Sequence, residues 1–156
     1  MAVIERAKFE VILVARSGKL MVAADLDGTT VDGSNTDLND PLGVAIREVG
    51  GSVGDISSVD DDDIATVDST KTDQFIDTAE LRILQSIEGN LDDVDTTAGS
   101  HSRRFSQLAT QVEKKLQRLE KKLEDKYGVG VPVMTAGVIL LDIADHNDDL
   151  PTTESS

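Results

Sequence analysis

The clearest fold signal in the chain is residues 102–127, "SRRFSQLATQVEKKLQRLEKKLEDKY". Apolar residues recur there every three or four positions, which is the spacing of one face of an α-helix. Gly128 follows as a helix-ending residue. The stretch predicts one long amphipathic helix with basic flanks, and its apolar seam needs a partner, either within the chain or in another subunit. The seam consists of Phe105, Leu108, Val112, Leu116, Leu119, Leu123 and Tyr127.

Residues 70–89 predict a second helix, of about five turns. Ile76, Ala79, Ile83 and Ile87 form one stripe, and Gly89-Asn90 predicts its end.

Two shorter helices are predicted upstream. In "DPLGVAIREVGG", residues 40–51, Asp40 is a plausible N-cap, Pro41 suits the first helical position, and Gly50-Gly51 ends the element. The run "SSVDDDDIATV", residues 57–67, offers Ser or Asp caps for about one helical turn.

The N-terminal segment leaves two interpretations open. Residues 2–16 fit a helix by the spacing of Val3, Ala7, Val11 and Val14, but the run from Phe9 also suits a strand. Gly18 is expected to end either element, and residues 27–39 have the composition of a loop.

The C-terminal segment changes character after Gly128. Glycines and Pro132 punctuate it, and an uncharged, β-prone run follows. It is expected to dock as a short strand, either on the apolar N-terminal run of its own subunit or on a partner. The candidate partner-binding residues are Val133, Val138, Ile139, Leu140, Leu141 and Ile143.

The predicted fold class is therefore mainly α. We expect a helical bundle with one long helix in the C-terminal half, extended N-terminal and C-terminal arms, and a short β-strand near the C-terminus. The expected divisions are an N-terminal apolar segment and loop (1–39), the helical bundle (40–128), and an extended arm with the docking strand and an acidic tail (129–156).

Composition narrows the function classes. The chain carries a formal net charge of −15, and residues 25–95 hold 19 acidic against 3 basic side chains. Broad binding to a phosphate backbone needs basic excess, so nucleic-acid binding is not expected. The acidic surface either keeps the protein in solution or lets a polyanion pass without holding it. No cysteine is present, no run is apolar enough to span a membrane, and no signal peptide is expected.

The stretch "DLDGTTVDGSN", residues 25–35, resembles the first motif of haloacid-dehalogenase-type phosphatases. That resemblance implies a magnesium-dependent phosphohydrolase with Asp25 as nucleophile and Asp27 handling the proton. Such a site also needs a strand ending at Asp25 and a nearby cation to hold the phosphoryl group. The helical remainder leaves no room for a doubly wound sheet.

Two simpler hypotheses exist for the same stretch. Asp25, Asp27 and Asp32 could offer oxygens to calcium, but the glycine spacing differs from an EF-hand loop and the closing Glu is missing. A turn-rich loop needs no ligand at all. We expect no enzyme activity, no cofactor and no metal site.

Three phrases together are similar to the head-to-tail connector (adaptor) proteins of tailed bacteriophages. They are "DGTTVDGSNTDLNDPLGVAIREVGG" (27–51), "DQFIDTAELRILQSIEGNLDDVD" (73–95) and "QLATQVEKKLQRLEKKLEDKYGVG" (107–130). The resemblance spans roughly residues 28–143. It implies a structural virion protein of the neck, assembled in the host cytoplasm, with no catalytic residues.

The resemblance also implies partners. Copies of the chain would form a ring, commonly of twelve, beneath the portal protein, and the termini would reach the portal or other neck and tail proteins. DNA would pass through the lumen without specific binding. The expected subunit-interface residues are Phe105, Leu108, Val112, Leu116, Leu119, Leu123, Arg118 and Lys122. The basic flanks either meet the acidic face of the next subunit or form local ion pairs; they are Arg103, Arg104, Lys114, Lys115, Arg118, Lys121 and Lys122.

Overall fold

A computed structural model describes residues 5–95 and 102–128, with side chains described over 5–91 and 106–128. The described residues form helices and no strand, which confirms the mainly α prediction. The helices are α1 (Arg6–Ala23), α2 (Asn39–Glu48), α3 (Asp61–Ala65), α4 (Thr72–Asp95) and α5 (Ser102–Tyr127), with short 3-10 turns at Thr36–Leu38 and Ser69–Lys71. The chain divides into two compact units, residues 1–121 and 122–156.

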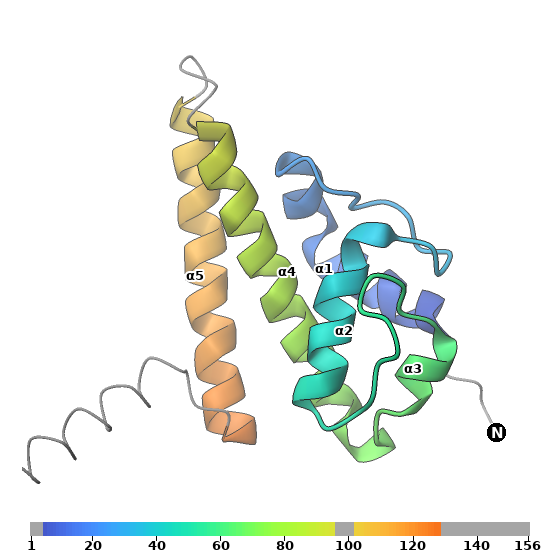
Figure 1. Ribbon diagram of the computed structural model, residues 1–156. Coiled ribbons are helices and arrows are strands. Elements are labelled where there is room, and N and C mark those ends of the chain that lie inside the picture. Colours follow the sequence, from blue (N-terminus) through green and yellow to red (C-terminus); the bar gives the residue numbers. More distant parts are fainter. Residues whose placement is uncertain (1–4, 96–101, 129–156) are drawn as a thin grey trace, which may run out of the picture. The chain divides into compact units, whose positions relative to one another are not determined.

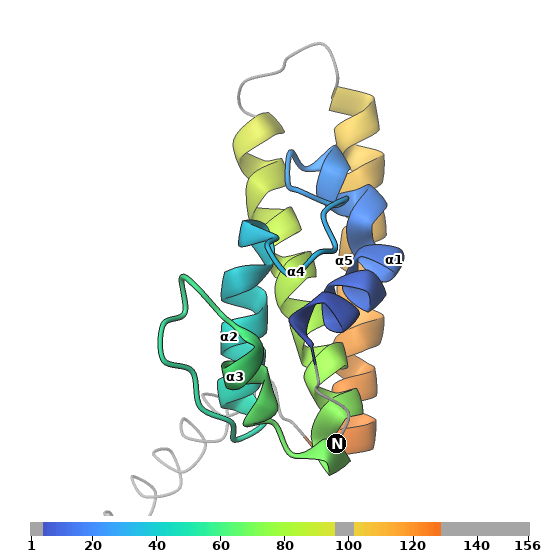
Figure 2. The same cartoon turned by 90° about the vertical axis from the view of Figure 1, so that its right-hand side faces the viewer.

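Helix α4 is the centre of the first unit, with α1 and α2 packed against it (Figures 1 and 2). Phe9 of α1 meets Phe75 of α4 edge-to-face, with ring centroids 5.1 Å apart. Leu42 and Ile46 of α2 are fully buried. Every residue of α4 from Phe75 to Glu80 is buried as well, so this helix has almost no solvent face over one and a half turns.

Helix α1 differs from the prediction for the N-terminal segment. Arg6–Ala23 forms one helix, so an extended arm is wrong for these residues, and Gly18 lies in the middle of the helix rather than at its end. A Cβ on Gly18 would lie 2.6 Å from the carbonyl oxygen of Gly28. Gly18 is therefore required by the close approach of the following loop, which its sequence position alone does not reveal.

Two helix boundaries also differ from the prediction. Helix α2 begins at Asn39, with Leu38 as its N-cap, so Asp40 lies inside the first turn and does not cap the helix. Helix α4 continues through Gly89-Asn90 to Asp95. A Cβ on Gly89 would meet nothing within 4 Å, so Gly89 is tolerated inside the helix. The acid-capped turn is confirmed: Asp60 and Asp63 form a reciprocal capping box at the start of α3.

The apolar seam of α5 is buried within the chain. Val112 is 0% exposed, Leu116, Leu119 and Leu123 are also buried, and Leu108 is half-buried. These four buried residues therefore contribute to the core within the chain. Phe105, Arg103 and Arg104, together with the six candidate partner-binding residues from Val133 to Ile143, lie outside the residues whose side chains are described.

Candidate functional site

A buried ion pair holds the loops to the start of α1. Arg6 and Glu10 are one turn apart, their Nε and Oε1 atoms are 2.8 Å apart, and their side chains are 6% and 0% exposed. Glu10 accepts hydrogen bonds from the backbone N–H groups of Gly33 (2.7 Å) and Asn35 (3.2 Å). The pair thus satisfies loop donors that would otherwise be buried without partners.

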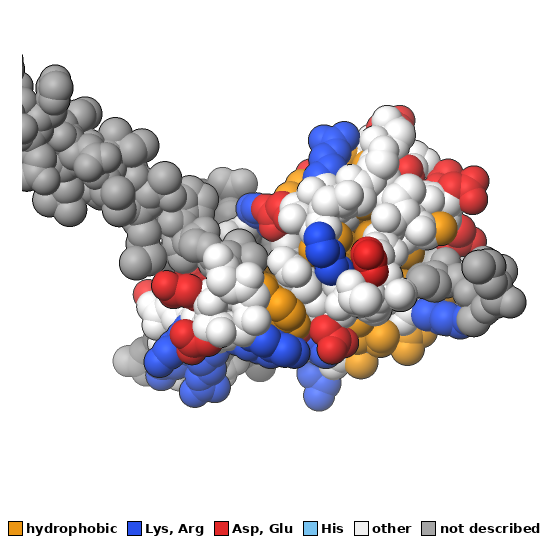
Figure 3. Space-filling model, turned by 90° about the horizontal axis from the view of Figure 1, so that it is seen from below, with side chains coloured by type: hydrophobic (Ala, Val, Ile, Leu, Met, Phe, Trp, Pro, Cys, Tyr) orange, Lys and Arg blue, Asp and Glu red, His pale blue; other side chains and the backbone are white. Residues whose placement is uncertain are grey.

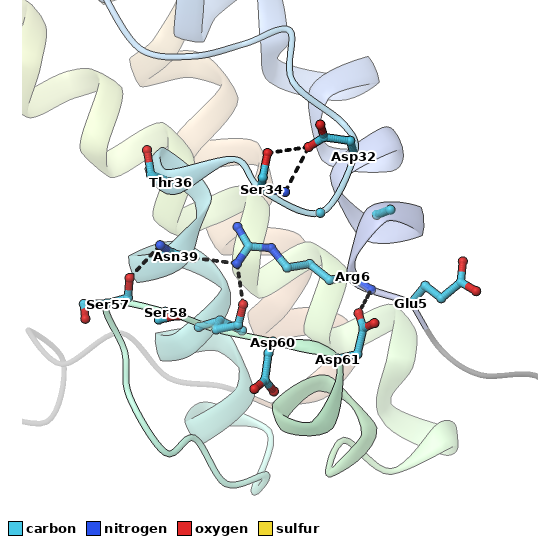
Figure 4. A pocket seen from close by; sticks show the side chains of 13 residues that line it. Glu5, Arg6, Asp32, Ser34, Thr36, Asn39, Ser57, Ser58, Asp60 and Asp61 are labelled. Carbon is cyan, nitrogen blue, oxygen red and sulfur yellow. Dashed lines mark hydrogen bonds between the residues drawn. The ribbon is translucent and has the colours of Figure 1, made fainter.

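The Arg6 guanidinium reaches in the other direction, toward the loop before α3. It donates to Asn39 Oδ1 at 2.6 Å (Figure 4). It also donates to the carbonyl oxygens of Val59 and Asn35. Its backbone N–H donates to Asp61 Oδ1 at 2.6 Å. All three guanidinium nitrogens therefore have partners within the chain, so Arg6 is not a free cation for an incoming phosphate.

A polar hollow of about 580 Å³ lies beside this pair. Glu5, Asp32, Asp60 and Asp61 contribute exposed carboxylates to its lining. Ser34, Thr36, Asn39, Ser57 and Ser58 supply the remaining polar side chains (Figure 4). The hollow offers carboxylate acceptors and hydroxyl groups, which are groups suited to binding a polar ligand.

The structure places Asp25 at the end of a helix, not at the end of a strand. Asp25 has φ 62°, and the N–H groups of Asp25 and Leu26 bond the carbonyl oxygens of Val22 (3.2 Å) and Met21 (2.9 Å). This is a Schellman motif with Asp25 as its left-handed residue. A phosphatase nucleophile of this type follows a strand, whereas Asp25 follows the helix α1. The position of Asp25 therefore does not meet this requirement of the phosphohydrolase alternative.

Asp27 stabilises the turn that follows. Its Oδ1 accepts hydrogen bonds of 3.0 Å from the Thr29 N–H, the Thr29 hydroxyl and the Thr30 N–H. These bonds from Thr30 and Thr29 hold the pKa of Asp27 well below its usual range. Such an acid is a poor proton donor at neutral pH, and its geometry is that of a local turn.

The same Asp-x-Ser/Thr device recurs along the chain. Asp32 accepts from Ser34, Asp55 from Ser57, and Asp68 from Thr70, in each case from the backbone N–H and the hydroxyl two residues on. Each set of bonds lowers the pKa of its aspartate. Many of the acids therefore act as turn and cap residues. Among the described side chains, 5–91 and 106–128, no three carboxylate or histidine groups are arranged to hold a metal ion.

A second charged cluster joins α1, α4 and α5. The Nη1 atom of Arg16 lies 3.1 Å from Asp77 Oδ1 and 3.0 Å from Glu80 Oε2. Lys115 of α5 lies 3.0 Å from Glu80 Oε1 and donates to the Arg16 carbonyl oxygen at 2.8 Å. Burial opposes the charge on Arg16, but the bonds to Glu80 and Asp77 outweigh it and raise the pKa of the guanidinium. Lys115, predicted as a flank for a neighbouring subunit, binds inside its own chain.

Part of the outward face of α5 is basic. Lys114, Arg118 and Lys121 are exposed at helical spacing opposite the buried seam, and none forms an ion pair with another described residue. Lys122 is exposed beside them. A group of exposed acids lies at the start of α2, in the loop before α3, and on α3: Asp40, Asp55, Asp60, Asp61 and Asp62. Helix α5 itself also carries exposed acids, among them Glu113 and Asp125.

The buried polar clusters were not foreseen from sequence. The sequence contains a weak indication of the Arg6–Glu10 pair, because these two residues are four positions apart inside a largely apolar segment. Nothing in the sequence indicates that Glu80 would receive a cation from each of two other helices.

Comparison with family models, curated proteins and solved structures gives no match. In the described part of the chain, no helix combines the length and apolar composition needed to cross a lipid bilayer. A functional assignment therefore depends on the residues and their geometry.

Proposed function

We propose that this protein is a structural adaptor of a phage neck, a ring of identical subunits that joins the portal to the tail and forms part of the DNA channel. It acts by shape and association and has no catalytic role. Its C-terminal arm, including a short strand within residues 133–143, docks on a neighbouring molecule of the neck.

The charge of the exposed side chains supports this proposal. Lys114, Arg118 and Lys121 form a basic stripe on α5, and a group of exposed acids lies on α2, α3 and the loop before α3. Two different and complementary patches give head-to-tail contacts, which close into rings when the rotation allows.

The remaining charge fits a channel for DNA. A formal net charge of −15 gives a surface that repels phosphate over most of its area. Even a few unopposed basic contacts would hold DNA strongly, and a ring contact that covers the basic stripe removes them. The function therefore needs the basic side chains to face protein and the lumen to be acidic or neutral.

The direct test is the mass and shape of the purified protein, measured by light scattering and electron microscopy, alone and with portal protein. We expect rings that bind portal. Reversing the basic stripe (Lys114→Glu, Arg118→Glu, Lys121→Glu) should abolish rings. Adding Asp40→Lys and Asp62→Lys should restore them in part. A monomer that ignores portal would overturn the proposal.

A further inference from the structure

The outer face of α1 is an exposed apolar stripe beside two lysines. Val11 is 51% exposed and Val22 55% exposed, and Ala15 lies between them at helical spacing. Lys8 and Lys19 are exposed on the same face of the helix. Figure 3 shows the face of the molecule seen from below, where apolar and basic side chains both reach the surface. The stripe is notable because most large apolar side chains of the described residues are buried.

One segment of the chain has the complementary composition. Residues 138–149, "VILLDIADHNDD", combine an apolar run with Asp142, Asp145, Asp148 and Asp149. No Lys or Arg occurs after Lys126. An apolar run followed by acids matches an apolar stripe bordered by lysines, because apolar burial gives affinity and the charges fix orientation.

We propose that residues 138–145 of one copy dock on the outer face of α1 of the next copy in the ring. The inference rests on the proposed function, and it identifies the neighbouring molecule that receives the C-terminal arm. The apolar residues from Val138 to Ile143 cover Val11, Ala15 and Val22, while Asp142 and Asp145 lie toward the lysines.

The dimensions agree with this assignment. From Val11 to Val22 the helix rises about 16 Å, and an extended stretch of five or six residues covers the same length. The nine residues between Gly128 and Val138 can span up to about 30 Å when extended. In a closed ring of head-to-tail contacts every α1 face receives one arm, so no apolar stripe is left open.

Engineered disulfides give a direct test because the chain has no cysteine. Val22→Cys and Leu141→Cys are introduced in separate full-length chains of different mass, and the two are mixed and oxidised. We expect a cross-linked pair of one chain of each kind, since a disulfide needs the two Cα atoms within about 7 Å. The matched control is Val31→Cys, an exposed apolar position (37%) on the loop after α1. It should cross-link at least about tenfold less, a difference that corresponds to 1.4 kcal/mol.

Assembly of the variants separates this inference from the proposed function. Lys19→Glu should raise the protein concentration at half-assembly about tenfold, and Asp142→Lys in the same chain should reverse the effect. Rings that form without the Val22–Leu141 cross-link overturn the inference and leave the proposed function standing. A disulfide that closes within a single chain carrying both cysteines also overturns it. A wild-type protein that stays monomeric overturns both.

Discussion

Arg6 and Glu10 form a salt bridge of 2.8 Å between Nε and Oε1 that is almost completely shielded from water. The pair contacts the loop after α1 through Gly33 and Asn35 and the loop before α3 through Val59. One ion pair thus fixes two long connections to the same end of a helix. Because burying charge is costly, the pair must be kept intact to be tolerated.

Arg6→Met should lower the free energy of unfolding by about 3–5 kcal/mol, because Glu10 would remain buried without its cation. Urea denaturation measures this. The matched control is Lys8→Met, which removes the exposed Lys8–Glu5 pair (4.0 Å) from the same helix. It should cost at most about 1 kcal/mol. Equal losses for the two variants would contradict the structural role of Arg6.

Gly18→Ala should destabilise the protein by about 1–3 kcal/mol. Its Cβ would lie 2.6 Å from the Gly28 carbonyl oxygen. A Cβ on Gly28 would lie 2.1 Å from the Gly18 carbonyl oxygen, so the two backbone segments are in close contact and neither can move without a cost in stability. Gly89→Ala serves as the control, because its Cβ would meet nothing within 4 Å in α4. It should stabilise by about 0.5–1 kcal/mol through helix propensity. Thermal melting of the two variants should therefore shift in opposite directions.

Asp25→Gly should raise the free energy of unfolding by about 1 kcal/mol, because glycine adopts φ 62° without the steric cost of a side chain. Asp25→Ala removes the same carboxylate and should lower it. The two variants should also be compared for magnesium-dependent hydrolysis of a generic phosphate ester, where we expect no activity before or after the change. Hydrolysis by the wild type that disappears in both variants would instead favour the phosphohydrolase alternative.

Stability should fall at acidic pH in a way that depends on four turn aspartates. The pKa values of Asp27, Asp32, Asp55 and Asp68 are lowered in the folded chain. Their contribution is therefore complete above the unfolded value, about 3.9, and is lost as the pH falls through the folded values. Replacing all four by Asn keeps a turn-forming side chain but removes the titration.

The measurement for this prediction is the free energy of unfolding between pH 7 and pH 2. The fourfold Asn variant should lose less stability on acidification than the wild type. Asp125→Asn, at an exposed position of α5, should follow the wild-type curve. An unchanged slope in the fourfold variant would show that these turns do not contribute to acid sensitivity.

Glu80→Ala should weaken the attachment of α5, because Glu80 receives Arg16 on one oxygen and Lys115 on the other. Its side chain is only 8% exposed, but Arg16 and Lys115 are 41% and 33% exposed and are solvated when Glu80 is removed, so we expect a loss of about 1–3 kcal/mol. Glu48→Ala removes the more exposed pair with Arg82 and should cost at most about 1 kcal/mol. Limited proteolysis should cut α5 faster in the first variant only.

Local sequence determined the helices with strong periodicity. The seam from Leu108 to Leu123 and the stripe from Ile76 to Ile87 predict α5 and α4, since their apolar residues recur at helical spacing. The α3 turn follows from Asp60 and Asp63, because a capping box involves residues three apart. These features depend on neighbours within one or two turns, which is why the sequence alone is sufficient.

Tertiary structure decided the rest. Residues 2–16 fit helix or strand by pattern, and packing of Phe9 on Phe75 favours the helix. Gly18 and Gly89 look alike in sequence, yet only Gly18 has a second backbone against it. Likewise, nothing local distinguishes Lys115, which binds Glu80, from Lys114, which faces outward. Each of these outcomes depends on residues far away in sequence, and their positions are known only once the chain has folded.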